Sequence, residues 1–276
     1  MKAMILAAGR GERMRPLTDT CPKPMLAAGG KPLIAWHLER LAAAGFRDVV
    51  INHAHLGHVI EQGLGDGRQF GLSIRYSAEP AALETAGGIA TALPMLGPGP
   101  FLVINGDVFC DFDVGRARGI AEQMRIGDLL AWCVLVDNPP HHPDGDFALR
   151  GGRLYNNVGD VGDVGDVGDV GDIGGVSRAG GAEGAGNTGR GGLGLLTFSG
   201  IGVYAPALFD GLQPGRRAPL APLLREAARQ SRAGAEKLIG RWLDIGTPQR
   251  LAELDAELTR TRHEAAGAAP RAGGSV

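Results

Sequence analysis

Apolar runs alternate with helical patterns through the first half of the chain. Short apolar segments bounded by glycine, proline or polar residues predict buried strands, and apolar residues spaced three or four apart predict helices. The strands are expected at Met4–Leu6, Asp48–Asn52, Ser73–Tyr76, Phe101–Ile104 and Leu129–Val136. The helices are expected at Lys31–Ala44, Leu56–Leu64, Thr85–Leu96 and Val114–Met124. Such alternation favours a mostly parallel sheet with helices on both faces.

The regular pattern returns near Leu195. The segment LLTFSGIGVYAPALF predicts a strand and a short helix, and the next elements are expected as a helix at Ala218–Gln230, a strand at Leu238–Ile245 and a helix at Thr247–Arg260. Thr247 is the expected N-cap of the last helix, with Pro248 as its first residue. We therefore expect one α/β domain over residues 1–262, a Rossmann-like, mostly parallel mixed sheet, followed by a disordered tail at 263–276.

A glycine-rich segment interrupts this domain at about 157–194. It contains the period-three repeat VGDVGDVGDVGDVGD and then GGVSRAGGAEGAGNTGRGG. So much glycine with so little apolar surface cannot build a core, and the composition predicts a flexible insertion. Regular aspartates also suggest a calcium-binding array, but known β-roll repeats have nine residues and this repeat has three.

Composition excludes several classes of partner. The chain has 276 residues, 44% of them hydrophobic, and a formal net charge of −2. No long basic stripe occurs, so neither nucleic acid nor an anionic membrane is expected as a partner. The three cysteines have no zinc or disulfide spacing, and the first apolar run is too short for a signal peptide or a membrane span. We expect a soluble, cytoplasmic protein.

The loop after the first strand carries the sharpest chemical signal. Gly9 and Gly11 let backbone N–H groups approach phosphate oxygens, while Arg13 and Lys23 supply positive charge. This loop lacks the Gly-Lys-Ser/Thr of a Walker loop, and it has Met14 where the dinucleotide fingerprint needs a third glycine. The loop therefore predicts a polyphosphate site of another kind.

The segment LAAGRGERMRPLTDTCPKP, starting at Leu6, resembles the signature of the sugar-phosphate nucleotidyltransferases. The resemblance implies the nucleotide-diphospho-sugar transferase fold and a reaction in which a sugar 1-phosphate attacks a nucleoside triphosphate. It also implies Arg13, Lys23 and Asp107 as catalytic residues. The nucleotide-binding residues that it implies are Leu6, Ala7, Ala8, Gly9, Gly11, Glu12, Arg13, Lys23, Glu79, Glu84 and Thr85.

Two aspartates are placed to hold a hard cation. Asp107 follows the apolar strand FLVI, and Asp244 ends the strand-like segment RWLD. Carboxylates beyond strand ends, together with nucleotide phosphates, suit Mg²⁺, which takes only one or two protein carboxylates. The resemblance implies the same magnesium site. The simpler alternative is that Asp107 or Asp244 caps a helix.

The same resemblance extends to the base and the sugar. Glu79, Glu84 and Thr85 are base-side candidates, although Thr85 also suits a helix cap. Sugar-side candidates are Asn105, Gly145, Asp146, Thr197, Ser199 and Gly200. The segments INHAHLG, LETAGG, VLVDNPPHH and TFSGI are similar to the branch of the family that uses UTP and N-acetylmuramic acid 1-phosphate in peptidoglycan recycling. The glycine-rich insertion replaces the family's Glu-Lys-Pro motif, which leaves the sugar open.

Alternatives remain at this point. The chain could act on mannose, glucose or heptose 1-phosphate, with a uridylyl, thymidylyl or guanylyl donor, or it could be a non-catalytic, ligand-sensing relative. His53, His55 and His58 suggest zinc, but no aspartate or cysteine completes a tetrahedral set. His141 and His142 are expected in a loop near the sugar.

Overall fold

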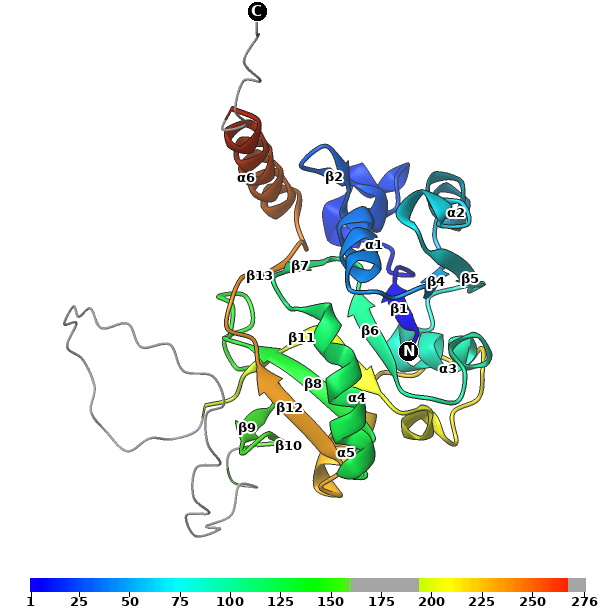
Figure 1. Cartoon of the computed structure of the whole chain (residues 1–276), viewed down its shortest axis with the longest axis vertical. Helices are drawn as coiled ribbons and strands as arrows, with labels where there is room; N and C mark the ends of the chain where they lie inside the picture. The colour runs from blue at the N-terminus through cyan, green and yellow to red at the C-terminus, as the bar shows by residue number, and fades with distance from the viewer. Residues whose placement is uncertain (158, 160–193, 268–276) are drawn as a thin grey trace, which may run out of the picture.

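The computed structural model describes residues 1–157, 159 and 194–267. It is organised around a nine-stranded sheet of order β5-β4-β1-β6-β11-β8-β12-β10-β9 (Figure 1). The strands are β1 (Ala3–Leu6), β4 (Asp48–His53), β5 (Ser73–Ala78), β6 (Phe101–Asn105), β8 (Ala131–Val136), β9 (Ala148–Arg150), β10 (Arg153–Tyr155), β11 (Thr197–Tyr204) and β12 (Ala233–Lys237).

The strand directions confirm the predicted fold class. β4, β1 and β6 are parallel, β5 is parallel to β4, and β12 is parallel to β8. β11 runs antiparallel to both β6 and β8, and β10 is antiparallel to β12 and β9. The result is a mostly parallel mixed sheet whose parallel strands end at a common edge, where α/β proteins bind their ligands.

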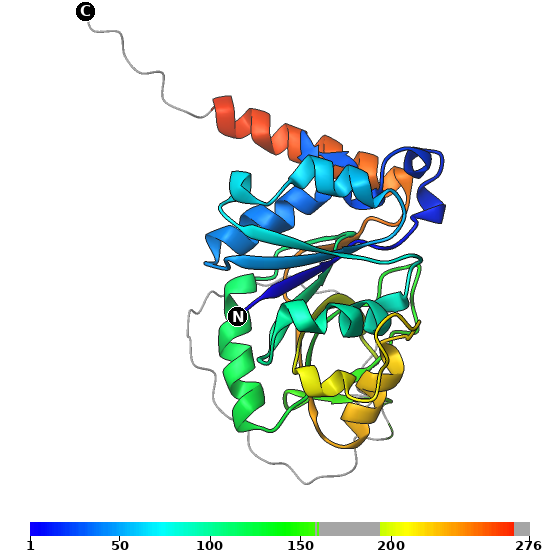
Figure 2. The same ribbon diagram turned by 90° about the vertical axis from the view of Figure 1, so that its right-hand side faces the viewer.

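Helices cover both faces of this sheet (Figure 2). Their bounds are α1 (Leu33–Ala43), α2 (Gly57–Leu64), α3 (Glu84–Leu96), α4 (Ala117–Ile126), α5 (Ala221–Arg229) and α6 (Pro248–Gly267). One apolar core joins α1, α2 and α4 to the sheet, and a second joins α3 and α5 to the opposite face. α6 lies against the two-stranded sheet of β2 (Ala27–Ala28) and β3 (Lys31–Pro32).

Alternation along the strands explains how one sheet serves two cores. Ala3 and Ile5 of β1 face the core of α1 and α2, whereas Met4 faces the core of α3. In β4, Ile51 joins the first core and Val50 the second. Because both faces are buried, these strands read as continuous apolar runs in the sequence.

The strand predicted at Leu238–Ile245 is shorter in the structure, where only β13 (Trp242–Asp244) is extended within that range. The strand β12 (Ala233–Lys237) ends just before the range and was not predicted. β12 has the weak strand formers Ala-Gly-Ala, and it is extended because it pairs with β8 in parallel. This pairing overrides local propensity, so the sequence pattern missed the strand.

Element ends also differ from the prediction. α1 begins at Leu33 because Lys31 and Pro32 pair with β2, and α6 continues past Arg260 to Gly267. Thr247 is confirmed as the N-cap of α6, since its Oγ1 accepts a hydrogen bond from Arg250 N at 3.3 Å. Of the predicted insertion, residues 158 and 160–193 lie outside the described residues, as do 268–276 of the predicted tail. Within the described ranges, no helix is long and apolar enough to cross a membrane.

An aromatic cluster in the second core offers a test of this packing. Phe209 stacks on Phe101 at 6.1 Å between ring centroids and meets Tyr204 edge-on. Phe209→Ala should lower the free energy of unfolding by about 3–5 kcal/mol, because it removes a buried ring and leaves a cavity. Ile126→Ala, at a side chain 73% exposed, should change it by less than about 0.5 kcal/mol. Urea denaturation of both variants measures the difference, and equal effects would contradict the assigned core.

Candidate active site

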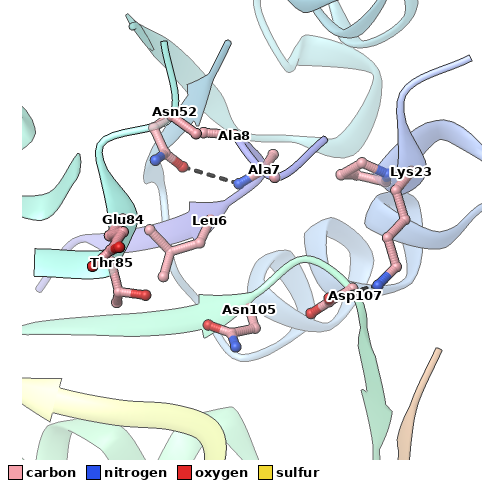
Figure 3. A pocket seen from close by; sticks show the side chains of 12 residues that line it. Leu6, Ala7, Ala8, Lys23, Asn52, Glu84, Thr85, Asn105 and Asp107 are labelled. Atoms are coloured by element: carbon pink, nitrogen blue, oxygen red, sulfur yellow. Dashed lines mark hydrogen bonds and ion pairs between the residues drawn. The ribbon is translucent and has the colours of Figure 1, made fainter. Parts of the chain in front are cut away.

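The ends of three neighbouring strands form the floor of a cavity. The register places Leu6 of β1 beside Asn52 of β4 on one side and Asn105 of β6 on the other. The cavity has a volume of about 200 Å³. Its lining comprises Leu6, Ala7, Ala8, Gly9, Lys23, Pro24, Asn52, Ala82, Glu84, Thr85, Asn105 and Asp107 (Figure 3).

Asn52 fixes the start of the first loop. Its Oδ1 accepts a hydrogen bond from Ala7 N at 2.9 Å, and its Nδ2 donates to Glu79 Oε1 at 2.7 Å. The other carboxylate oxygen of Glu79 accepts from Leu83 N at 3.0 Å. Buried polar groups need such partners, so this chain of bonds ties the first loop to the segment before α3. Glu79 therefore lies behind the cavity and does not line it.

The first loop turns at Gly11 and returns at Lys23. Gly11 has φ +65°, and a Cβ there would lie 2.9 Å from Thr18 Cγ2, so a larger residue would be strained and crowded. Thr18 Oγ1 also donates to Gly11 O at 2.9 Å. Lys23 is buried, and its Nζ lies 2.6 Å from Asp107 Oδ2. The loop thus places the ammonium group of Lys23 on the cavity wall next to Asp107.

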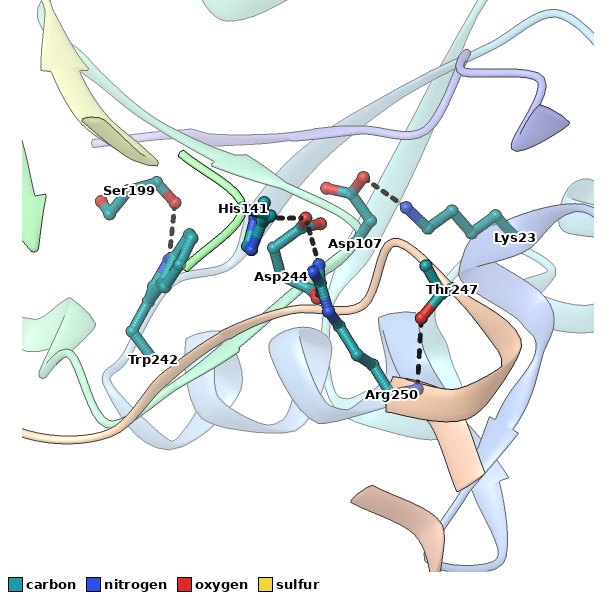
Figure 4. A network of polar contacts seen from close by, with 8 residues as sticks. All are labelled: Lys23, Asp107, His141, Ser199, Trp242, Asp244, Thr247 and Arg250. Atoms are coloured by element: carbon teal, nitrogen blue, oxygen red, sulfur yellow. Dashed lines mark hydrogen bonds and ion pairs between the residues drawn. The ribbon is translucent and has the colours of Figure 1, made fainter. Parts of the chain in front are cut away.

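A small sheet brings the two predicted metal ligands together. β7 (Val108–Cys110) pairs antiparallel with β13, so Asp244 lies opposite Val108, and Ile245 N donates to Asp107 O at 2.9 Å. Asp244 Oδ2 accepts from Arg250 Nη1 at 3.0 Å and lies 3.4 Å from His141 Nε2 (Figure 4). Neither aspartate caps a helix, which removes the simpler alternative for both.

The helix α1 packs beside β7 and binds its backbone through Arg40. The Arg40 guanidinium donates to the carbonyl oxygens of Cys110 and Phe112. Burial, followed by the charge of Arg40, lowers the pKa of His37 to about 4, so this ring is neutral near pH 7. Arg40, which is partly buried, thus holds the strand that follows Asp107, and the buried His37 lies on the same helix.

A second cavity adjoins the first and shares Asn105 and Asp107 with it. Its volume is about 340 Å³, and its lining is Arg13, Asn105, Asp107, Val108, His141, His142, Asp146, Thr197, Phe198, Ser199, Gly200, Trp242 and Asp244. Gly200 has φ +80°, and a Cβ there would lie 2.6 Å from Asn105 Nδ2, so glycine allows the two strands to meet. Trp242 donates to Ser199 O at 2.9 Å, which fixes its ring on the wall.

The base-side candidates begin α3. Glu84 has φ +59°, a conformation that costs energy for a residue with a side chain, and its carboxylate lies 2.6 Å from Arg217 Nη2. Thr85 is not the N-cap, because that position is Leu83 and no side chain caps the helix. Both Glu84 and Thr85 line the first cavity.

The structure brings most of the predicted site residues together, with some exceptions. Gly145 has φ +67° and packs against Asn138 and Leu195 beside the second cavity. Glu12 is exposed and lies 3.4 Å from Arg10. Arg13 reaches the second cavity and not the first. Gly11, Glu12, Glu79 and Gly145 therefore line neither cavity.

Asn52, Trp242 and Arg250 were not among the predicted site residues, and His141, expected only in a loop near the sugar, lies against Asp244. Asn52 could have been found, because it is a polar residue at the carboxyl end of an apolar strand. The others depend on contacts between distant segments. His53 Nε2 lies 2.7 Å from Glu61 Oε1, and His55 Nε2 lies 3.2 Å from Thr18 O. Among the described residues, no group of three or more His, Cys, Asp or Glu side chains is placed to hold a metal ion.

The fold and the glycine-rich first loop define an α/β protein with a cavity at the carboxyl edge of its sheet, where such proteins bind ligands. Comparison with known proteins agrees: residues 2–142 match the nucleotidyl transferase family. Over 260 residues the chain is 51% identical to the N-acetylmuramate alpha-1-phosphate uridylyltransferase of Neisseria meningitidis serogroup B, covering 93% of this chain and 97% of that protein. The chain belongs to the nucleotidyl transferase family.

Other relatives are more distant. The mannose-1-phosphate guanylyltransferase of Mycobacterium tuberculosis is 38% identical over 145 residues, or 49% of this chain and 40% of that protein. A solved structure from Bacillus anthracis, assigned as a glucose-1-phosphate thymidylyltransferase and bound to sucrose, has a TM-score of 0.70 at 20% identity. It covers 94% of this chain and 95% of its own, and at that identity it supports the fold alone.

The bond between Asn52 and Glu79 gives a pH-dependent prediction. Asn52→Asp can still accept from Ala7 N, but it places a second carboxylate against Glu79 Oε1. Like charges this close raise the pKa of the pair in the folded state, so folding then takes up a proton that the unfolded chain lacks. We expect the variant to lose about 2–4 kcal/mol of stability relative to the parent at pH 7.5 and to recover much of it at pH 5.

Urea denaturation of parent and variant at both pH values measures this difference. A loss of stability that is the same at pH 5 and pH 7.5 would contradict the bond between the two side chains.

Proposed function

We propose that the protein transfers the uridylyl group of UTP to N-acetylmuramic acid 1-phosphate, forming UDP-N-acetylmuramic acid and pyrophosphate. The observation that carries the proposal is the meeting of two cavities at Asn105 and Asp107, with Lys23 of the first cavity bound to Asp107. A nucleotide phosphate bound in the first cavity and a sugar phosphate bound in the second would meet there. The identity to the uridylyltransferase of Neisseria, which extends over 93% of this chain, supports the choice of substrates.

The reaction needs no protein nucleophile. An oxygen of the sugar 1-phosphate attacks the α-phosphorus of UTP, a new P–O bond forms, and the bond from the α-phosphorus to the bridging oxygen breaks. The attacking phosphate is already ionised, and pyrophosphate leaves with the electron pair. Catalysis in such a step comes from in-line positioning and neutralisation of charge.

The first cavity would hold the nucleotide. Backbone N–H groups of Ala8 and Gly9 would face the phosphates, and Arg13, in the adjoining second cavity, would neutralise charge on the reacting and leaving phosphates. Nothing lies within 4 Å of the Cβ position of Gly9, so that backbone is open to a ligand. Lys23 would face the reacting phosphates, and Glu84 and Thr85 would read the edge of the uracil. Glu79 would act through Asn52.

Asp107 and Asp244 would hold Mg²⁺. The donor set fits, because each carboxylate keeps its Oδ1 without a hydrogen-bond partner among the described residues while Oδ2 is bound to a cationic side chain. Hard carboxylate oxygens are the ligands that Mg²⁺ prefers. When bound, the ion would supply positive charge at the reacting phosphates. Lys23 and Arg250 would offset the repulsion between the two carboxylates, and with His141 they would orient them.

The second cavity would hold the sugar. Asn105, Asp146, Thr197, Ser199 and Gly200 line it and offer hydroxyl, amide, carboxylate and backbone groups to sugar hydroxyls. Gly145 would supply backbone next to them. We also place the enzyme in the cytoplasm and in peptidoglycan recycling. The free cysteines Cys21, Cys110 and Cys133 suit a reducing compartment.

Substrate identity can be tested by pyrophosphate release. The purified protein would be assayed with the 1-phosphates of N-acetylmuramic acid, N-acetylglucosamine, glucose, mannose and a heptose against UTP, dTTP, GTP and ATP. We expect the highest kcat/KM for UTP with N-acetylmuramic acid 1-phosphate. A higher value for another pair would replace the substrates, and inactivity with all pairs would point to a ligand-sensing relative.

The magnesium assignment predicts a large effect of Asp107→Asn. The variant keeps the shape of the side chain but removes a charge that balances Lys23 and the metal. We expect turnover to fall by about a hundredfold to several thousandfold, equivalent to about 3–5 kcal/mol of transition-state stabilisation. UTP affinity should change much less, because the first loop and the base-side residues are untouched.

The matched control is Asp128→Asn. Asp128 is exposed and pairs with Arg232, and neither residue lines either cavity. This variant should leave turnover unchanged. Steady-state pyrophosphate release at varied Mg²⁺, beside UTP titration of each variant, measures both quantities. Near-parental turnover of Asp107→Asn would overturn the metal assignment.

A further inference from the structure

The second cavity is lined by both acidic and basic side chains, and its acidic ones are Asp107, Asp146 and Asp244. Its lining includes Arg13, His141 and His142. His141 lies on Asp244 at 3.4 Å. Arg13 lies at the same end, because a Cβ on Gly246 would be 3.1 Å from Arg13 Nη2 and 2.9 Å from Asp244 Oδ2. Arg13 and His141 therefore both lie at the Asp244 end of the cavity.

His142 belongs to a different part of the same cavity. Its Nε2 lies 3.0 Å from Asp146 Oδ1, and Asp146 Oδ2 accepts from Phe198 N at 2.8 Å. Asp146 and Phe198 also line an apolar pocket of about 380 Å³ that extends toward α5. The His142 ring is thus fixed beside Asp146, a residue that lines both this cavity and the apolar pocket.

The loop that carries His142 is held in place from both sides. Asn138 Nδ2 donates to Pro143 O at 2.9 Å and to Leu195 O at 3.0 Å, and its Oδ1 accepts from Thr197 Oγ1 at 2.9 Å. His142 N donates to Pro139 O at 2.9 Å. An imidazole on such a loop loses little freedom when it binds a ligand, and preorganisation of this kind favours recognition.

The ring retains one polar atom for a ligand. Within the described part of the chain, His142 Nδ1 has no hydrogen-bond partner, and Nε2 is bound to Asp146. An imidazolium donates from both nitrogens, so it can bridge Asp146 and a second carboxylate. A carboxylate that enters the cavity without such a partner would lose its hydration and gain nothing in return.

We propose that His142 recognises a carboxylate on the sugar and is a specificity-determining residue for acidic sugar 1-phosphates. This inference rests on the proposed function, because N-acetylmuramic acid carries such a group in the lactyl ether at C3. The acetyl and lactyl methyl groups have an apolar neighbour in the adjoining pocket, whose lining includes Phe147, Phe198 and Leu220. Asp146 acts through His142 as a positioning residue.

The test compares three substrates that differ only at the lactyl group: N-acetylmuramic acid 1-phosphate, the same compound with its carboxylate converted to a carboxamide, and N-acetylglucosamine 1-phosphate. Pyrophosphate release with UTP gives kcat/KM for each. The variants are His142→Ala and, as a matched control, His58→Ala, whose side chain is exposed on α2. His142 is half-exposed in a loop, so its removal leaves the two cores untouched.

We expect His142→Ala to lower kcat/KM for the acidic substrate by about 10- to 100-fold, the usual effect of losing a charge-assisted hydrogen bond. The value for the carboxamide should change by less than about threefold, since that substrate has no charge to pair. His58→Ala should match the parent with all three substrates.

Other outcomes separate the two proposals. If the parent favours N-acetylmuramic acid 1-phosphate but His142→Ala loses activity equally with acid and amide, or with neither, then His142 does not read the carboxylate. If the parent uses the carboxamide as well as the acid, the carboxylate is not read at all. If the parent favours N-acetylglucosamine 1-phosphate, the proposed function itself is overturned.

Discussion

The antiparallel pairing of β7 with β13 is the contact on which the site depends. Neither strand belongs to the nine-stranded sheet, so each finds its backbone partners mainly in the other. The pairing sets Asp244 opposite Val108 and bonds Ile245 N to Asp107 O. Backbone groups that are shielded from water need such partners, and this pairing brings together two carboxylates from distant parts of the chain.

Two neighbouring carboxylates need compensating charge, and the fold supplies it from two directions. Lys23 comes from the first loop and Arg250 from the first turn of α6, and the His141 ring, from the loop after β8, also lies beside Asp244. Each of these side chains meets Oδ2 of its aspartate, so the Oδ1 atoms are without a hydrogen-bond partner among the described residues. Phosphates would bring further negative charge, which is why a site of this kind gains from a metal ion.

The two cavities rest on different kinds of support. The first lies on the ends of β1, β4 and β6, whose register is fixed by two packed cores. The second lies on loops and on β11, with Asn138, Asp146 and Trp242 holding its walls through individual hydrogen bonds. The family match over residues 2–142 contains all the lining of the first cavity, whereas much of the second cavity lies beyond it. The proposed nucleotide site thus falls within the matched region, and the proposed sugar site draws on residues outside it.

The sequence alone determined the parallel half of the sheet, because Met4–Leu6, Asp48–Asn52 and Phe101–Ile104 are apolar on both faces and alternate with amphipathic helices. It also predicted a polyphosphate site in the first loop, because Gly11, Arg13 and Lys23 suggest this chemistry by their residue types alone. Thr247 as an N-cap is likewise a local signal. These features depend on residues close together in the chain, and so their patterns can be read directly.

Only the tertiary structure decided the rest. β12 is a strand because it pairs with β8, and its Ala-Gly-Ala sequence gives no sign of this. Glu79 resembles a base-binding residue in the sequence, yet its carboxylate is used by Asn52 and Leu83 N. The contacts of Asp244 with Arg250 and His141 depend on where three separate segments meet. Such placements follow from the packing of the whole chain, and the periodicity of a single segment cannot encode them.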